Sequence, residues 1–188
     1  MIFRAVLLLL WMSSACAAEG LSVEASSRGS AVTIHARALL DASYAVAWAT
    51  LTDYNHLAQF IPGMRRSAVV EQRANSAVVE QLGEARFLFF TFPIEVTVES
   101  TSRPPNSIDI RVLKGNLKRL DGGYRIESVA AGKLLLRWEG VIEPEGMLPP
   151  LLGEAVMRAN IEDQFSGMVH EIERRESART GRVKAGGQ

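Results

Sequence analysis

The feature that most constrains the fold is one change of hydrophobic period, at Pro149 and Pro150. Before it, short runs rich in Val, Ile, Phe and Leu recur about every ten residues, with turn-forming clusters between them, as in an antiparallel meander. The runs are 67–72, 76–82, 86–99, 107–114, 123–130 and 133–143. After it, the apolar residues fit one face of a long helix, for which Pro150 suits the first turn. A curved sheet needs cover on one face, so we expect it to wrap around this helix.

The long helix has a predicted apolar face and a predicted polar face. The apolar face consists of Leu152, Val156, Ala159, Phe165, Met168, Val169 and Ile172. The polar face consists of Glu154, Arg158, Glu162, Glu173 and Arg174. Residues 177–188 have no apolar periodicity and are predicted to be disordered. The sequence therefore predicts an α+β domain over residues 19–176, with no internal repeat.

A hairpin and a helical corner precede the meander. Residues 21–25 and 31–38 alternate and flank a turn-forming stretch, which predicts two paired strands. Residues 42–52 are mostly apolar and predict a helix opened by Asp41, followed by a second short helix that stops before Pro62. We expect this corner to close one end of the groove between the sheet and the long helix. Within the run 86–99, Pro93 predicts either a strand end or a bend.

The first eighteen residues have the pattern of a secretory signal peptide. Arg4 precedes a short apolar run, and the run ends at small residues 15–18 that suit cleavage. The run is well below the roughly 20 residues of a membrane span. Lipidation of Cys16 is the alternative, but the usual aliphatic residue three places upstream is absent. We favour cleavage and a periplasmic location.

Composition excludes several functions. Cys16 is the only cysteine, so the mature chain has neither disulfides nor thiol chemistry. The formal net charge is +0, which argues against a nucleic-acid partner. No histidine pair has metal-ligand spacing, and neither a metal nor a cofactor is expected.

Four stretches resemble the polyketide cyclase/dehydrase branch of the START-like helix-grip superfamily, also called SRPBCC, which is related to the coenzyme-Q-binding proteins. They are residues 45–72, 88–100, 113–127 and 143–152, and the first contains the pattern Trp-x-x-Leu-x-Asp-Tyr…Phe-x-Pro-Gly. The resemblance implies a helix-grip fold with an apolar cavity between the sheet and the C-terminal helix. It also implies a lipid, quinone or polyketide-like ligand, without implying a reaction.

No catalytic constellation is visible, and no catalytic residue is predicted. Asp53 could be an acid/base group at the cavity, but we favour a helix cap that accepts backbone N–H bonds. His56 could be a polar group at the cavity mouth, but a surface turn residue is the simpler interpretation. His35 and His170 are interpreted as a solvated strand residue and a structural helix-end residue.

Apolar residues with a special position are the better ligand-binding candidates. Tyr124 and Trp138 combine a large apolar area with a polar tip, which suits an amphipathic ligand. Phe60, Met147 and Leu148 stand at corner or loop positions and are candidates for the cavity rim. The sequence thus favours an exported binding protein for a hydrophobic small molecule or lipid. A cyclase or dehydratase acting on such a ligand, and a protein-interaction domain, remain alternatives.

Overall fold

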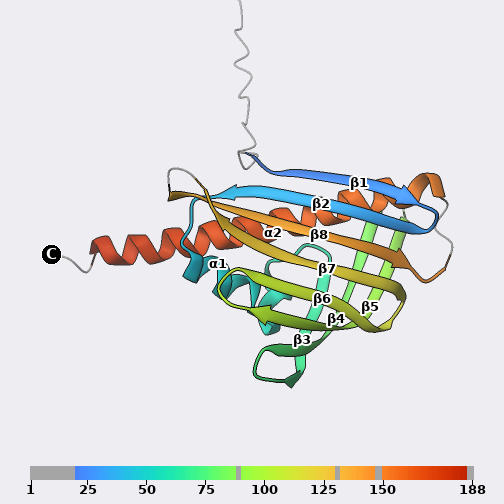
Figure 1. Cartoon of the computed structure of the whole chain (residues 1–188), viewed down its shortest axis with the longest axis horizontal. Coiled ribbons are helices and arrows are strands. Elements are labelled where there is room, and N and C mark those ends of the chain that lie inside the picture. The colour runs from blue at the N-terminus through green and yellow to red at the C-terminus, as the bar shows by residue number, and fades with distance from the viewer. Residues whose placement is uncertain (1–19, 88–89, 130–131, 147–149, 186–188) are drawn as a thin grey trace, which may run out of the picture.

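The computed structural model describes residues 20–87, 90–129, 132–146 and 150–185. Its elements, in chain order, are β1 (Ser22–Arg28), β2 (Ala31–Leu40), α1 (Tyr44–Leu51), the 3-10 helix η1 (Tyr54–Gln59), β3 (Met64–Gln72), β4 (Ser76–Phe87), β5 (Phe90–Arg103), β6 (Ser107–Gly115), β7 (Leu117–Ser128), β8 (Leu134–Pro144) and α2 (Pro150–Ala185). The strands form one 8-stranded antiparallel sheet in the order β1-β2-β8-β7-β6-β5-β4-β3. The curved sheet and the long helix confirm the predicted helix-grip fold (Figure 1).

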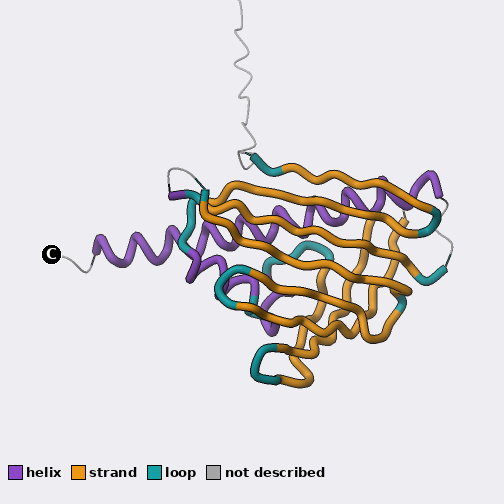
Figure 2. The backbone as a smooth tube through the Cα atoms, in the orientation of Figure 1, coloured by secondary structure: helices purple, strands orange, loops and turns teal. Residues whose placement is uncertain are grey.

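The helix α2 lies along one face of the sheet, and α1 and η1 sit beside it (Figures 1 and 2). It contacts β1, β2, β4 and α1. The core between them contains Ile34 and Leu136 from the sheet and Val169 and Ile172 from α2, all fully buried. Because burying each such side chain contributes about 1.5–3 kcal/mol, this layer stabilises the grip of sheet on helix.

The N-terminal hairpin and the two short helices lie where the sequence predicts them. The first helix differs at its start, because Ser43 occupies the N-cap position that was expected for Asp41. The Ser43 hydroxyl does not cap its own helix but donates a 2.8 Å hydrogen bond to Glu176 of α2. The start of α1 is thus tied to α2.

The predicted boundary between the runs 76–82 and 86–99 is wrong. Strand β4 continues to Phe87, and β5 begins at Phe90 and passes through Pro93. Pro93 pairs with Glu84 of β4, whereas β5 pairs with β6 only from Val96 onward. Proline has no N–H to donate and is tolerated where one side of a strand has no neighbour.

One of the turn-forming clusters expected between the predicted runs, at residues 121–123, lies inside β7 and forms no turn. Gly122 is paired with Gly140 of β8, and a Cβ atom on Gly122 would lie 2.7 Å from the Cα of Gly140. The two glycines therefore allow strands β7 and β8 to approach closely, and they do not form a turn.

Helix α2 includes residues 177–185, for which the sequence predicts disorder. This segment has no apolar periodicity, but it forms a helix that extends past the sheet and therefore needs no apolar face (Figure 1). Arg179 is paired with Glu176 three residues earlier, and the Thr180 hydroxyl donates to the Glu176 carbonyl oxygen at 3.0 Å. Such local pairs support an exposed helical turn.

The predicted signal peptide lies outside the described residues. Among the helices that the structure describes, none is long and apolar enough to cross a membrane.

Candidate functional site

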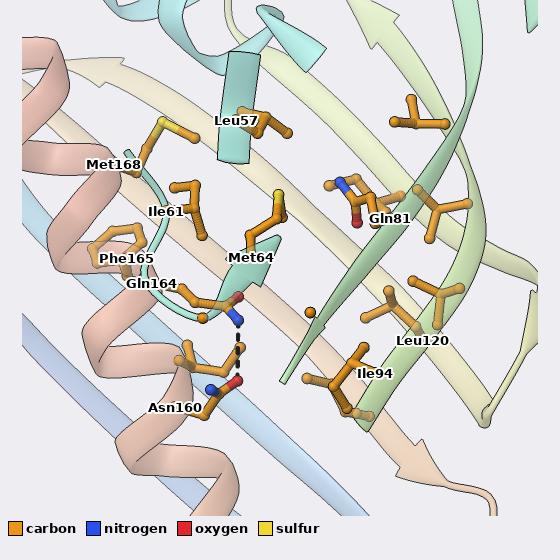
Figure 3. A pocket seen from close by; sticks show the side chains of 18 of the residues that line it. Leu57, Ile61, Met64, Gln81, Ile94, Leu120, Asn160, Gln164, Phe165 and Met168 are labelled. Atoms are coloured by element: carbon orange, nitrogen blue, oxygen red, sulfur yellow. Dashed lines mark hydrogen bonds between the residues drawn. The ribbon is translucent and has the colours of Figure 1, made fainter. Parts of the chain in front are cut away.

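A cavity of about 180 Å³ lies between the sheet, the corner around η1 and α2 (Figure 3). One water molecule needs about 10–15 Å³ measured in this way, so the space can hold an organic ligand. Its walls come from every layer of the fold. The lining residues are Leu51, Tyr54, Leu57, Ile61, Gly63, Met64, Val79, Gln81, Leu82, Gly83, Glu84, Ala85, Ile94, Val96, Val98, Ser100, Ile108, Ile110, Leu117, Leu120, Tyr124, Trp138, Ile142, Met157, Asn160, Ile161, Gln164, Phe165 and Met168.

The corner after η1 closes one side of the cavity. Leu57 of η1, Ile61 of the corner and Met64 at the start of β3 point into the cavity (Figure 3). Gly63 has a φ of 76°, and its carbonyl oxygen accepts a 2.8 Å hydrogen bond from the N–H of Glu84. Only glycine adopts this dihedral readily, so the chain can turn sharply and join β3 to β4.

The corner also contacts α2 very closely at Gly167. A Cβ atom on Gly167 would lie 2.5 Å from Cδ of Pro62 and 2.6 Å from the carbonyl oxygen of Phe60. The absence of a side chain at this position therefore lets the corner pack directly on the helix backbone.

Both aromatic residues predicted from the sheet, Tyr124 and Trp138, lie in the cavity wall. They are directly paired across β7 and β8 and therefore share one face of the sheet. Burial raises the pKa of the Tyr124 hydroxyl, and the nearby Tyr54 raises it further. The Tyr124 hydroxyl thus stays protonated near neutral pH and can donate a hydrogen bond.

The wall is apolar except for a few polar side chains that converge on the space. On α2, the Gln164 Nε2 donates to the Asn160 Oδ1 at 3.1 Å (Figure 3). Between η1 and β5, the hydroxyls of Tyr54 and Ser100 are 2.8 Å apart and share a hydrogen bond. An apolar cavity with a few placed polar groups is the usual form of a small-molecule site.

Of the three predicted rim residues, Phe60 is described, and it is not among the residues that line the cavity. Phe60 is half-buried at the corner, where the Arg175 guanidinium lies 5.3 Å from the centre of its ring. Phe60 therefore packs the corner against α2 through a cation–π contact. Met147 and Leu148 lie outside the described residues.

Asp53 and His56 lie outside the cavity lining and form an ionic link to α2. The Asp53 carboxylate is 2.6 Å from Nδ1 of His56 and accepts a 2.9 Å hydrogen bond from Arg175. Burial opposes the charge, but the bonds from His56 and Arg175 hold the pKa of the Asp53 carboxyl below its usual value. The predicted cap is wrong, because the Asp53 side chain makes no hydrogen bond to the backbone of η1.

His35 on β2 is exposed beside Glu139, as predicted. His170 is exposed on α2, but the predicted helix-end position is wrong, because α2 continues to Ala185. Within the described ranges, no group of three or more His, Cys, Asp or Glu side chains could hold a metal ion.

Sequence reasoning missed Asn160 and Gln164. The signal was present, because Met157, Ile161, Phe165 and Met168 form one helical stripe and the two amides lie within it. Polar residues inside an apolar stripe of a helix that covers a sheet must face either a partner or a cavity.

The matching family model is described as polyketide cyclase / dehydrase and lipid transport, and it matches residues 40–167. Among solved structures, the Zhui aromatase/cyclase from a Streptomyces species has 16% identity and a TM-score of 0.64 and covers 80% of this chain and 96% of that chain. The STAR-related lipid transfer protein from Xanthomonas axonopodis has 15% identity and a TM-score of 0.64, and the match covers 83% of this chain and 95% of that chain. A START superfamily protein from Mycobacterium smegmatis has 11% identity and a TM-score of 0.63 and covers 78% and 97%. At these identities the likeness shows a shared fold, and a search of curated proteins finds no match.

Proposed function

Because the chain belongs to the polyketide cyclase / dehydrase and lipid transport family, we propose that it binds a hydrophobic small molecule in the cavity between the sheet and α2. The observation that carries this proposal is the cavity itself, whose wall is built mainly from Leu, Ile, Val, Met and aromatic side chains. A ligand that buries roughly 200 Å² of apolar surface there would gain about 5 kcal/mol from burial alone.

The polar groups of the wall favour binding over cyclisation or dehydration. Glu84 is the only carboxylate among the described lining residues, and it is engaged by Arg65 and Arg86. Tyr124 is held in its protonated form, which suits a hydrogen-bond donor better than a general base. The Asp53 carboxylate, considered above as an acid/base group, is instead bonded to His56 and Arg175 outside the cavity lining.

We also propose that the protein is exported and acts in the periplasm. The support is the signal-like pattern of the first eighteen residues, with its charged start, short apolar run and small residues for cleavage. A carrier in an aqueous compartment needs a site that shields an apolar molecule from water, as this cavity does.

Native mass spectrometry of protein purified from its own periplasm tests the binding function. We expect a co-purifying lipid-like molecule that organic solvent releases unchanged. Leu120→Trp should exclude it by filling the cavity, and Trp138→Ala should lower its occupancy. Asp53→Asn and His56→Ala are matched controls outside the cavity and should leave occupancy largely intact.

Two results would contradict the proposal. A folded protein that stays empty across lipid extracts would favour a protein-interaction domain. A bound compound that emerges chemically altered, and whose alteration is abolished by Tyr124→Phe, would establish an enzyme. Far-UV circular dichroism of each variant separates loss of binding from loss of fold.

A further inference from the structure

Three amide side chains line the apolar cavity: Gln81 lies on β4, and Asn160 and Gln164 stand about one turn apart on α2. The bond between the two α2 amides occupies the Asn160 Oδ1 and one N–H of Gln164. Both N–H groups of the Asn160 amide and the Gln164 Oε1 have no hydrogen-bond partner among the described residues. In Figure 3 both α2 side chains project from the helix toward Ile94 and Leu120 on the opposite wall. A neutral hydrogen bond contributes about 0.5–1.5 kcal/mol net, so a ligand that pairs with these amide atoms gains affinity.

The amides are joined by other neutral groups. The Tyr124 hydroxyl lies in the same wall and has no hydrogen-bond partner among the described residues. Tyr54 and Ser100 share one hydrogen bond, which leaves one of their two hydroxyl protons free to donate. The cavity therefore offers several donors and an amide acceptor, all without charge.

Charged groups at the cavity are already neutralised. Among the described lining residues no Lys, Arg or His is present, and the carboxylate of Glu84 is bound by Arg65 and Arg86. An anionic head group in this space would be buried without a counter-ion, and a cationic one would find its only carboxylate occupied. Burial of an unpaired charge is much more costly than burial of a hydrogen-bonded neutral group.

We propose that the cavity selects ligands with an uncharged oxygen-bearing head, such as a carbonyl, carboxamide or hydroxyl group, on an apolar body. The amides of Asn160 and Gln164 recognise the head, since Asn160 donates to its oxygen and Gln164 accepts from any N–H or O–H. The inference rests on the proposed function, because it concerns the ligand of the same cavity. It makes the α2 amide pair the specificity determinant of the site.

Two compounds with one chain and different heads test this selectivity. The assay is displacement of the neutral fluorescent dye N-phenyl-1-naphthylamine from the full-length mature protein at pH 8. Oleamide, whose head is neutral, should displace the dye about tenfold better than oleate, whose carboxylate is ionised. Lowering the pH to 5 should bring the displacement by oleate closer to that by oleamide, because part of the oleate becomes a neutral carboxylic acid.

Single substitutions assign the selectivity to the amides. Asn160→Leu and Gln164→Met keep similar side-chain volume, and each should weaken oleamide about three- to tenfold while dye binding persists. Ile161→Val is the matched control from the same helix wall and should leave the oleamide-to-oleate ratio unchanged. The wild-type comparison of the two compounds needs no variant, so it stands if a variant fails to fold.

The outcomes are distinct. Equal or tighter binding of oleate at pH 8, or an oleamide preference that survives both amide substitutions, overturns this inference and leaves the proposed function standing. Failure of the dye and of both compounds to bind the folded protein overturns the proposed function, and this inference with it.

Discussion

At Gly167 of α2, one added methyl group should destabilise the fold, because the corner packs directly on this position. In the interior of a helix, Gly→Ala normally stabilises by about 1 kcal/mol. At Gly167 the new Cβ would lie 2.5 Å from Pro62 and 2.6 Å from the Phe60 carbonyl oxygen, where unstrained contacts are about 3.5–4.0 Å. Overpacking of this kind costs about 1–3 kcal/mol, and the obstructing atoms belong to a proline ring and the backbone, which cannot rotate away. With the helical gain of about 1 kcal/mol set against this cost, we expect Gly167→Ala to lower the free energy of unfolding by up to about 2 kcal/mol.

Gly181 provides the matched control in the same helix. A Cβ atom there would have nothing within 4 Å, so Gly181→Ala should be neutral or stabilise by up to about 1 kcal/mol. Urea unfolding followed by far-UV circular dichroism measures both variants. Gly167→Ala should also weaken dye binding, since a displaced corner moves Ile61 and Met64 in the cavity wall. If Gly167→Ala stabilises the protein as Gly181→Ala does, then the close contact between corner and helix does not constrain the fold.

Two further predictions concern acid stability and export. Hydrogen bonds from Arg174 and Arg175 lower the pKa of the Glu171 carboxyl from 4.5 to about 2, so its stabilisation is complete above pH 4.5 and is lost as the pH falls toward 2. Because Arg174 is exposed and screened by water, urea titrations should show about 1–2 kcal/mol of this loss in the wild type and little of it in Glu171→Gln. For export, the intact mass of periplasmic protein should match a chain that begins at Ala18 or Glu19, whereas a mass with a diacylglyceryl group on Cys16 would identify a lipoprotein instead.

The architecture could be predicted from the sequence because it follows from hydrophobic period. Alternating runs specified the strands, and one stripe on the last segment specified α2. The strand boundaries that failed depend on pairing partners instead. Nothing local reveals that Gly122 faces Gly140 across two strands, or that Pro93 lies where β5 has no β6 neighbour. Glycine and proline usually indicate turns, but inside a long strand their role depends on the residue paired with them on the neighbouring strand.

Site residues could be predicted where the size and burial of a side chain determine its role. They could not be predicted where the role depends on a partner distant in the sequence. Tyr124 and Trp138 were found because large amphipathic rings on a core-facing strand suit a ligand wall. Asp53 was misassigned because its partner, Arg175, is 122 residues away in the sequence. Asn160 was missed because a polar residue on a long helix is usually solvated. Its position at the cavity depends on the sheet that packs over this face of α2.

The place of β8 between β2 and β7 also determines the order in which the chain can fold. Strands β3 to β8 each pair with the next strand in sequence and can add one after another. The hairpin of β1 and β2 cannot join them until β8 exists, because Val32 pairs with Ile142. Such distant pairing slows folding, and α2, which covers the sheet, is synthesised last of all. A growing chain therefore can neither close its sheet nor cover its core until β8 and α2 have been synthesised.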